Sequence, residues 1–171
     1  MKKVTILFIV LLMTAAFMAG DEGKAFEKGD NILDLSIGFS EFTTPFAIGY
    51  EHSISDNMGI NVSALILSWG YDFGSFGDYN QTLIMPQAHL LYHFTKIKAN
   101  KLDVYVGAGA GFSIYNTDWS DETAAGGVFL SGVVGLRYYV TKKIAIQARE
   151  TLVVIGDWGG SYTLIGVSFK F

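Results

Sequence analysis

The sequence predicts an all-β protein, an eight-stranded antiparallel up-and-down transmembrane β-barrel. Three observations predict this fold. Apolar and polar residues alternate with a period of two through eight segments, as they do in strands that have one face in an apolar environment. The connections between these segments are short turns on one side and longer loops on the other. The first 20 residues have the form of an export signal.

The N-terminal stretch MKKVTILFIVLLMTAAFMAG begins with two lysines, continues through the apolar run 4–13 and ends in small residues. This order is typical of a cleaved signal peptide, and a retained N-terminal anchor is the alternative. We expect residues 1–19 to be the signal, with cleavage between 16 and 20, and residues 20–171 to form the barrel domain. The sequence has no cysteine, which excludes disulfides and thiolate metal sites.

The charge of the chain limits its partners. The full sequence has a formal net charge of −4, and loss of Lys2 and Lys3 with the signal makes the exported part more acidic. Binding to nucleic acid needs a basic face for the phosphates, so we expect no nucleic-acid partner. No motif in the sequence indicates a cofactor, and we expect none.

The first four expected strands carry apolar side chains on one face and small or polar side chains on the other. In the first of them, Leu35 and Ile37 alternate with Asp34 and Ser36. Pro86 lies inside the fourth and cannot donate a hydrogen bond to a neighbouring strand, so we expect a bulge there, near the outer rim. The four segments are residues 32–39, 46–54, 58–69 and 83–94.

The stretch VYVGAGAGFSI in the fifth strand places Gly107, Gly109 and Gly111 on one face. A dinucleotide-binding loop needs G-x-G-x-x-G at a strand-to-helix turn, whereas this G-x-G-x-G lies inside an alternating segment. We therefore expect a strand whose glycines make room for large side chains from its neighbours. In the seventh strand Glu150 falls on the apolar face, which predicts a bulge or a strand end. The last four strands are 102–114, 128–140, 144–152 and a strand that contains Ile165, Val167 and Phe169 and ends at Phe171.

The connections alternate in length along the chain. Short or medium turns are expected at 55–57, 95–101 and 141–143. Longer loops are expected at 68–82, 115–127 and 154–161, with a brief one at 40–45 on the same side. This asymmetry is typical of outer-membrane barrels, with both termini and the short turns in the periplasm.

The composition of the polar face indicates which face points inward. It is rich in glycine, serine and asparagine and poor in lysine and glutamate, which suits a narrow interior better than a solvated surface. Its charges nearly balance, and buried charges must be paired. We therefore expect an apolar face toward lipid and a packed polar lumen, against the alternative of a soluble lipocalin-like barrel. The expected lumen charge network is Asp34, Glu51, Asp103, Arg137 and Arg149, with Lys170 on the same face.

The stretches LDVYVGAGAGFSIY, GVVGLRYYVTKKIAIQARE and IGVSFKF resemble the small eight-stranded outer-membrane barrels of Gram-negative bacteria, the OmpA/OmpX-like outer membrane protein β-barrel domain. The segment KAFEKGDNILDLSIGF is similar to the start of such barrels in Bacteroidetes. We expect an outer-membrane location, contact with membrane lipid and lipopolysaccharide, and a monomer. The resemblance implies folding by the outer-membrane assembly machinery. It also implies a C-terminal assembly signal made of Ile165, Val167, Phe169 and Phe171.

Two histidine-containing patterns are candidate chemical sites. His89 and His93 share one face of a strand but lie about 13 Å apart at roughly 3.3 Å per residue, too far to share a metal ion. We expect them to form hydrogen bonds in the lumen. Glu51, His52 and Ser53 are consecutive, so His52 faces away from the other two on a strand and no proton relay follows. Some eight-stranded outer-membrane barrels are lipid A deacylases, but the histidine and serine of their signature are two residues apart, whereas His52 and Ser53 are adjacent.

The longer loops are acidic and aromatic, whereas the short turns are basic. The turns hold Lys96, Lys98, Lys101, Lys142 and Lys143 against one acid. The acidic loops suggest either a solvated rim above an aromatic belt, or a surface that binds divalent cations bridging to lipopolysaccharide phosphates, or one that binds a cationic partner. Their acids are Glu41, Asp72, Asp78, Asp118, Asp121, Glu122 and Asp157.

Three functions follow from this reading. The first is a non-catalytic structural or surface-interaction protein, because eight strands leave an interior only wide enough for side chains. The second is a small ion-conducting pore gated by the lumen charges around Glu51, Arg137 and Arg149. The third is a lipid-modifying enzyme.

Overall fold

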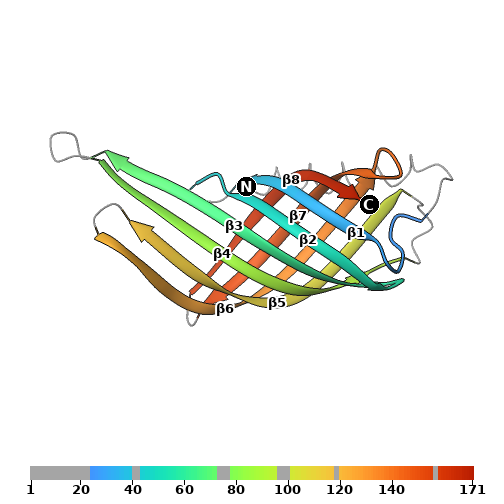
Figure 1. The fold of residues 1–171 in the computed structure, drawn as a ribbon, viewed down its shortest axis with the longest axis horizontal. Coiled ribbons are helices and arrows are strands. Elements are labelled where there is room, and N and C mark those ends of the chain that lie inside the picture. Colours follow the sequence, from blue (N-terminus) through green and yellow to red (C-terminus); the bar gives the residue numbers. More distant parts are fainter. Residues whose placement is uncertain (1–23, 40–42, 73–77, 96–100, 118–119, 156–157) are drawn as a thin grey trace.

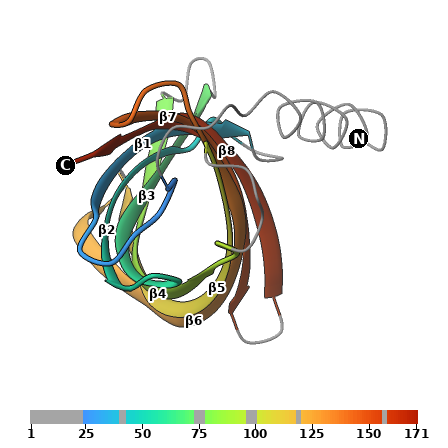
Figure 2. The same ribbon diagram turned by 90° about the vertical axis from the view of Figure 1, so that its right-hand side faces the viewer.

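The computed structural model describes residues 24–39, 43–72, 78–95, 101–117, 120–155 and 158–171, which form one closed antiparallel barrel (Figures 1 and 2). Each strand pairs with the next along the chain, and the last pairs with the first. No helix among the described residues is long and apolar enough to cross a membrane. The strands are β1 (Asn31–Phe39), β2 (Phe46–Ser55), β3 (Met58–Asp72), β4 (Asp78–His93), β5 (Leu102–Thr117), β6 (Ser120–Tyr139), β7 (Ile144–Ile155) and β8 (Trp158–Lys170).

The two ends of the barrel differ. We call the end where β1 begins and β8 finishes the terminal rim; it also carries the connections after β2, β4 and β6. The opposite end is the loop rim. The expected eight-stranded fold is confirmed, and the strands begin and end close to their expected bounds at the terminal rim.

The hairpins β3–β4 and β5–β6 are longer than expected at the loop rim. The segments 68–82 and 115–127, expected as loops, are mostly strand, and β3 to β6 contain 15 to 20 residues against 9 and 10 in β1 and β2. The barrel wall is therefore taller on this side (Figure 1). The alternation of apolar and polar residues ends there because, outside the bilayer, neither face of a strand has to be apolar. The backbone hydrogen bonds between the strands continue regardless of side-chain type.

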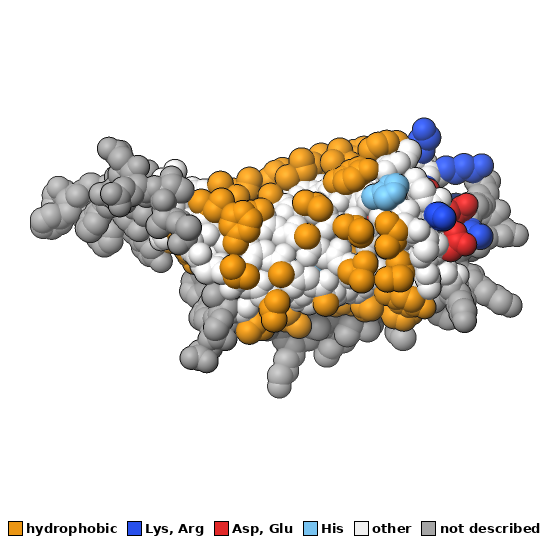
Figure 3. Space-filling view, turned by 60° about the horizontal axis from the view of Figure 1, so that its bottom comes forward, with side chains coloured by type: hydrophobic (Ala, Val, Ile, Leu, Met, Phe, Trp, Pro, Cys, Tyr) orange, Lys and Arg blue, Asp and Glu red, His pale blue; other side chains and the backbone are white. Residues whose placement is uncertain are grey.

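The apolar face points outward. The outward side chains form a broad apolar band around the barrel, including Leu130 and Ile37, which are 66% and 57% exposed (Figure 3). The inward side chains of the same strands are largely polar and buried. Such a band would be costly in water but is what the hydrocarbon core of a bilayer requires, so the soluble-barrel alternative is excluded.

The three alternate glycines face the lumen, as expected. A Cβ at Gly107 would meet the side chains of Leu91 and Val133, and one at Gly111 would meet the ring of Phe129. The missing Cβ atoms of these glycines therefore leave space for large side chains from β4 and β6, which fill the narrow interior.

Gly135 and Gly132 of β6 provide a test of this packing, because they lie on opposite faces of one strand. A Cβ at Gly135 would run into the ring of Tyr105, which is fully buried, whereas a Cβ at Gly132 has open space toward lipid. We expect Gly135→Ala to lower the free energy of unfolding by about 1 to 3 kcal/mol through overpacking. Gly132→Ala should change it by less than about 0.5 kcal/mol. Urea titration of the protein folded in lipid vesicles measures both, and equal effects would contradict the assigned faces.

Pro86 does not form the expected bulge. The β3–β4 register runs without a shift through Ala64 and Pro86. Between β4 and β5 the register is the same on both sides of Pro86, and only the pairs at Met85 and Pro86 are missing. The missing proline N–H is therefore accommodated by a local gap in hydrogen bonding without any insertion in the strand.

Glu150 causes neither a bulge nor a strand end. The register of β7 is continuous with both neighbours, and Glu150 stays on the outward face with Leu152 on one side and Ile146 on the other. Its Oε2 accepts a hydrogen bond of 2.5 Å from the hydroxyl of Thr163 on β8. A donor on the adjacent strand thus partly compensates a carboxyl group that faces lipid, which explains why the strand need not deform.

Candidate functional site

The lumen next to the terminal rim is built around the guanidinium group of Arg137, on β6. This side chain is completely buried. Its Nη2 donates to Asp34 Oδ2 at 2.9 Å and to Glu51 Oε2 at 2.6 Å, and its Nη1 donates to Asp103 Oδ2 at 3.2 Å. One cation therefore joins carboxylates from β1, β2 and β5 across the interior. These four members of the expected charge network do come together.

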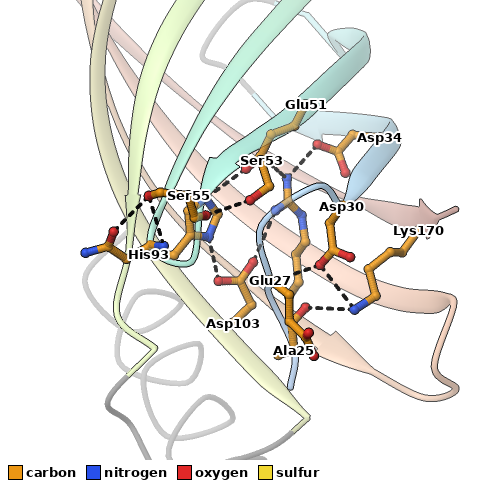
Figure 4. A network of polar contacts seen from close by, with 12 residues as sticks. Ala25, Glu27, Asp30, Asp34, Glu51, Ser53, Ser55, His93, Asp103 and Lys170 are labelled. Atoms are coloured by element: carbon orange, nitrogen blue, oxygen red, sulfur yellow. Dashed lines mark hydrogen bonds and ion pairs between the residues drawn. The ribbon is translucent and has the colours of Figure 1, made fainter. Parts of the chain in front are cut away.

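His93, at the end of β4, completes this cluster (Figure 4). Its Nδ1 lies 2.7 Å from Asp103 Oδ1 and its Nε2 lies 2.8 Å from Glu51 Oε1. The Asp103 contact has hydrogen-bond geometry, whereas the Glu51 contact has only the distance of an ion pair and is electrostatic. Because each ring nitrogen faces a carboxylate, the doubly protonated imidazolium fits this position best.

Residues 24–30 fold back over the mouth of the lumen at the terminal rim, which the sequence did not predict. The ring of Phe26 stacks on that of His93 with centroids 3.5 Å apart, and Phe26 is only 2% exposed. The Gly29 N–H donates to the Ser53 carbonyl, and Lys170 Nζ pairs with Asp30 Oδ2 at 3.3 Å. A single aromatic residue within an otherwise polar lead-in was the available signal for this segment.

Arg149 is not part of the Arg137 cluster, contrary to expectation. Its Nη1 donates to Asn61 Oδ1 at 3.3 Å and its Nη2 to His89 Nδ1 at 3.2 Å. His89 Nε2 lies 2.8 Å from Ser131 Oγ. Arginine only donates, so His89 Nδ1 must accept, and the neutral tautomer with the proton on Nε2 satisfies both contacts. Arg149 thus forms a second polar layer, nearer the loop rim, with uncharged partners.

A third layer, nearest the loop rim, is apolar. The expected polar lumen is therefore polar only in part. The runs ALIL in β3 and VFL in β6 are apolar on both faces, because there the inward face packs against other apolar side chains rather than forming polar contacts. Those runs were the missed signal. The layer consists of Ala47, Leu65, Met85, Phe129, Val153, Tyr162 and Leu164.

Among the described residues, the consecutive Glu51, His52 and Ser53 do not come together as a catalytic group. Glu51 and Ser53 point inward and are buried, whereas His52 is exposed on the outer face, with its Nδ1 2.9 Å from Asn31 Oδ1. Within the described parts of the chain, no three His, Cys, Asp or Glu side chains are placed to hold a metal ion.

A comparison of the sequence with protein families agrees with the closed eight-stranded barrel and its outward apolar band. The family described as Outer membrane protein beta-barrel domain matches residues 6–171. The chain belongs to this family. As a member, it is an outer-membrane β-barrel protein. No curated protein matches the chain in sequence.

Several outer-membrane proteins with solved structures have the same fold. OprG from Pseudomonas aeruginosa superposes with a TM-score of 0.68 at 13% identity, covering 88% of this chain and 99% of OprG. Neisserial surface protein A gives 0.62 at 17% identity, covering 83% and 95%. The N-terminal barrel domain of OprF from Pseudomonas aeruginosa gives 0.60 at 18%, covering 84% and 98%. At these identities the likeness shows the fold alone.

Two further sets of expected residues can be placed in this outer-membrane barrel. Ile165, Val167 and Phe169 point outward on β8, and Phe171 exchanges backbone hydrogen bonds with Asn31 of β1. Their role as an assembly signal stays a prediction. Of the expected loop acids, four lie in strands: Asp72 in β3, Asp78 in β4, and Asp121 and Glu122 in β6. Glu41, Asp118, Asp157 and the expected signal peptide lie outside the described residues.

Proposed function

We propose that this protein is a non-catalytic outer-membrane barrel with a closed lumen, which acts as a structural or surface-interaction protein through its acidic loop rim. The observation that carries the proposal is the filling of the lumen. Two polar layers and one apolar layer lie between the rims, and residues 24–30 cover the mouth at the terminal rim.

These layers oppose the passage of ions in different ways. At the Arg137 layer an ion would have to separate a buried guanidinium from three carboxylates, which leaves uncompensated charge in a region of low polarity. At the apolar layer it would have to shed its hydration shell among Leu65, Met85 and Phe129. Either step alone is a large barrier.

One observation favours the alternative of a small gated pore. The buried hydroxyl groups of Ser63 and Ser168 make no hydrogen bond with another described residue. Buried hydroxyls need partners, and water is the available one in a polar interior. Hydrated polar layers would support conduction if the apolar layer and the Arg137 cluster could rearrange.

Single-channel recording distinguishes the two. We expect the refolded protein, shown to be inserted in a planar bilayer, to give no discrete conductance steps, and Glu51→Gln to remain silent as well. Steps in the wild type whose size or open time changes in Glu51→Gln would overturn the closed-barrel proposal in favour of a pore gated by the lumen charges.

The interaction role rests on the acidic residues of the loop rim. Asp72 of β3 and Asp78 of β4 are directly paired in the register of the tall hairpin. Carboxylate oxygens are the ligands that divalent cations prefer in proteins, and an acidic sequence at this rim would also attract a cationic partner. The proposed ligand is lipopolysaccharide, bridged through its phosphates by divalent cations.

Neutralising all seven acids to their amides tests this role. We expect the calcium-dependent retention of lipopolysaccharide by the refolded protein to fall at least tenfold. A matched variant that neutralises Glu27 and Asp56 at the terminal rim should retain wild-type binding. Undiminished calcium-dependent binding in the sevenfold variant would refute the proposed role of the loop acids.

A further inference from the structure

The terminal rim holds a pocket of about 370 Å³ between residues 24–30, the turn 140–143 and the end of β8. The pocket brings together segments that are far apart in the sequence, and lysines dominate its charge. The lysines that line it are Lys24, Lys101, Lys142, Lys143 and Lys170.

Among the described residues, one of these lysines has an acidic partner. Lys170 Nζ lies 3.3 Å from Asp30 Oδ2, and it also donates to the carbonyl groups of Lys24 and Ala25. The other four lysines share the pocket with a single remaining acid, Glu27, and none of them forms an ion pair with a residue that the structure describes. The side chains that line the pocket therefore have an excess of three positive charges.

The turn that supplies two of the lysines has a fixed backbone. The hydroxyl of Thr141 accepts hydrogen bonds from the N–H groups of Lys143, at 3.2 Å, and of Ile144, at 3.0 Å. The Val140 N–H donates to the Ile144 carbonyl at 2.9 Å. The positive charges are thus held on a preorganised turn, which lowers the entropy lost when a ligand binds.

The remaining pocket lining combines one unsatisfied donor with apolar surface. Tyr139 is 4% exposed, and its hydroxyl makes no hydrogen bond with any described residue. Val140 and Phe171 are apolar and exposed, and Phe171 is the residue directly after the end of β8. The pocket therefore adjoins the apolar band; Figure 3 shows basic and acidic side chains gathered at one end of that band.

We propose that this pocket binds the headgroup of an anionic glycerophospholipid in the leaflet level with the terminal rim. The lysines neutralise the headgroup phosphate, as basic pockets on membrane proteins do. The Tyr139 hydroxyl donates to a phosphate oxygen, and the acyl chains lie along Val140 and Phe171. A free phosphate would use the charges but leave this apolar surface without a ligand. The site is at the opposite end of the barrel from the proposed interaction surface and does not depend on it.

Native mass spectrometry of the refolded protein, released from micelles doped with phosphatidylglycerol or with phosphatidylcholine of the same chains, tests the proposal. We expect the wild type to retain one phosphatidylglycerol at least tenfold more often than one phosphatidylcholine. The triple variant Lys101→Gln, Lys142→Gln, Lys143→Gln should lose this preference, and Tyr139→Phe should weaken retention about threefold.

The matched control keeps the charges: Lys101→Arg, Lys142→Arg, Lys143→Arg should bind as the wild type does. Lys28→Gln removes one exposed lysine near the same rim but outside the pocket lining, and it should also have no effect. Equal retention of both lipids, or unchanged retention in the triple glutamine variant, would overturn the proposal. Inorganic phosphate that occupies the site and displaces the lipid at equal concentration would overturn the assignment to a lipid.

Discussion

Replacing Arg137 with methionine is expected to lower the free energy of unfolding in lipid vesicles by about 3 to 5 kcal/mol. The substitution keeps most of the volume but removes the only arginine that contacts Asp34, Glu51 and Asp103. Three carboxylates would then share the lumen with His93 as the single cation of the cluster, and an uncompensated buried charge is among the most costly defects in a protein. Urea unfolding followed by tryptophan fluorescence measures the loss.

Arg149→Met is the matched control, because it removes an equally inward arginine whose partners are Asn61 and His89. Breaking contacts with neutral groups strands no charge, so the loss should be about 1 to 2 kcal/mol. Adding Glu51→Gln to the Arg137 variant should restore part of its stability, since one stranded carboxylate is removed. Losses of equal size in the two arginine variants would show that charge pairing does not organise the lumen.

Phe129→Ala is expected to cost about 3 to 5 kcal/mol of unfolding free energy, because it empties the centre of the apolar layer. Phe129 is 1% exposed, whereas its neighbour Val128 on the opposite face is 75% exposed. Val128→Ala should therefore cost less than about 1 kcal/mol and serves as the control. The same urea titration in vesicles measures both variants.

We expect Phe129→Ala to give no single-channel conductance steps in the planar bilayer. The cavity opens one layer only, and the Arg137 cluster with residues 24–30 still blocks the passage. Conductance steps from Phe129→Ala alone would mean that the apolar layer is the sole barrier and that the polar layers already pass ions.

The alternation of apolar and polar residues was enough to predict the strands and their faces, because one face of every strand must be apolar within the bilayer. The prediction failed where the strands extend beyond the bilayer. Beyond the band, residues 70–72 and 120–125 continue the ladder through backbone hydrogen bonds that are independent of side-chain type. Glu150 and Pro86 were expected to disturb the strands, but the first has Thr163 as a partner and the second needs only a missing hydrogen bond.

The charge network was predictable as a set but not as an arrangement. Counting charges on the inward face identified Arg137 and its three carboxylates. It could not separate Arg149 from them, because that depends on the stagger between strands: Arg137 pairs with Gln147, whereas Arg149 pairs with Gly135. His93 was placed in the lumen, but its two carboxylate contacts depend on distances that no pattern encodes.

The position of residues 24–30 has a consequence for the order in which the molecule is completed. Phe26 rests on a ring from β4, Gly29 is bonded to β2, and Asp30 pairs with a side chain of β8. This complete set of contacts can form only after β1 has paired with β8, because the partner of Asp30 lies on β8. The segment that precedes β1 in the chain therefore completes its contacts after the barrel has closed, and its ion pair with Lys170 adds a link across the pairing of β1 and β8.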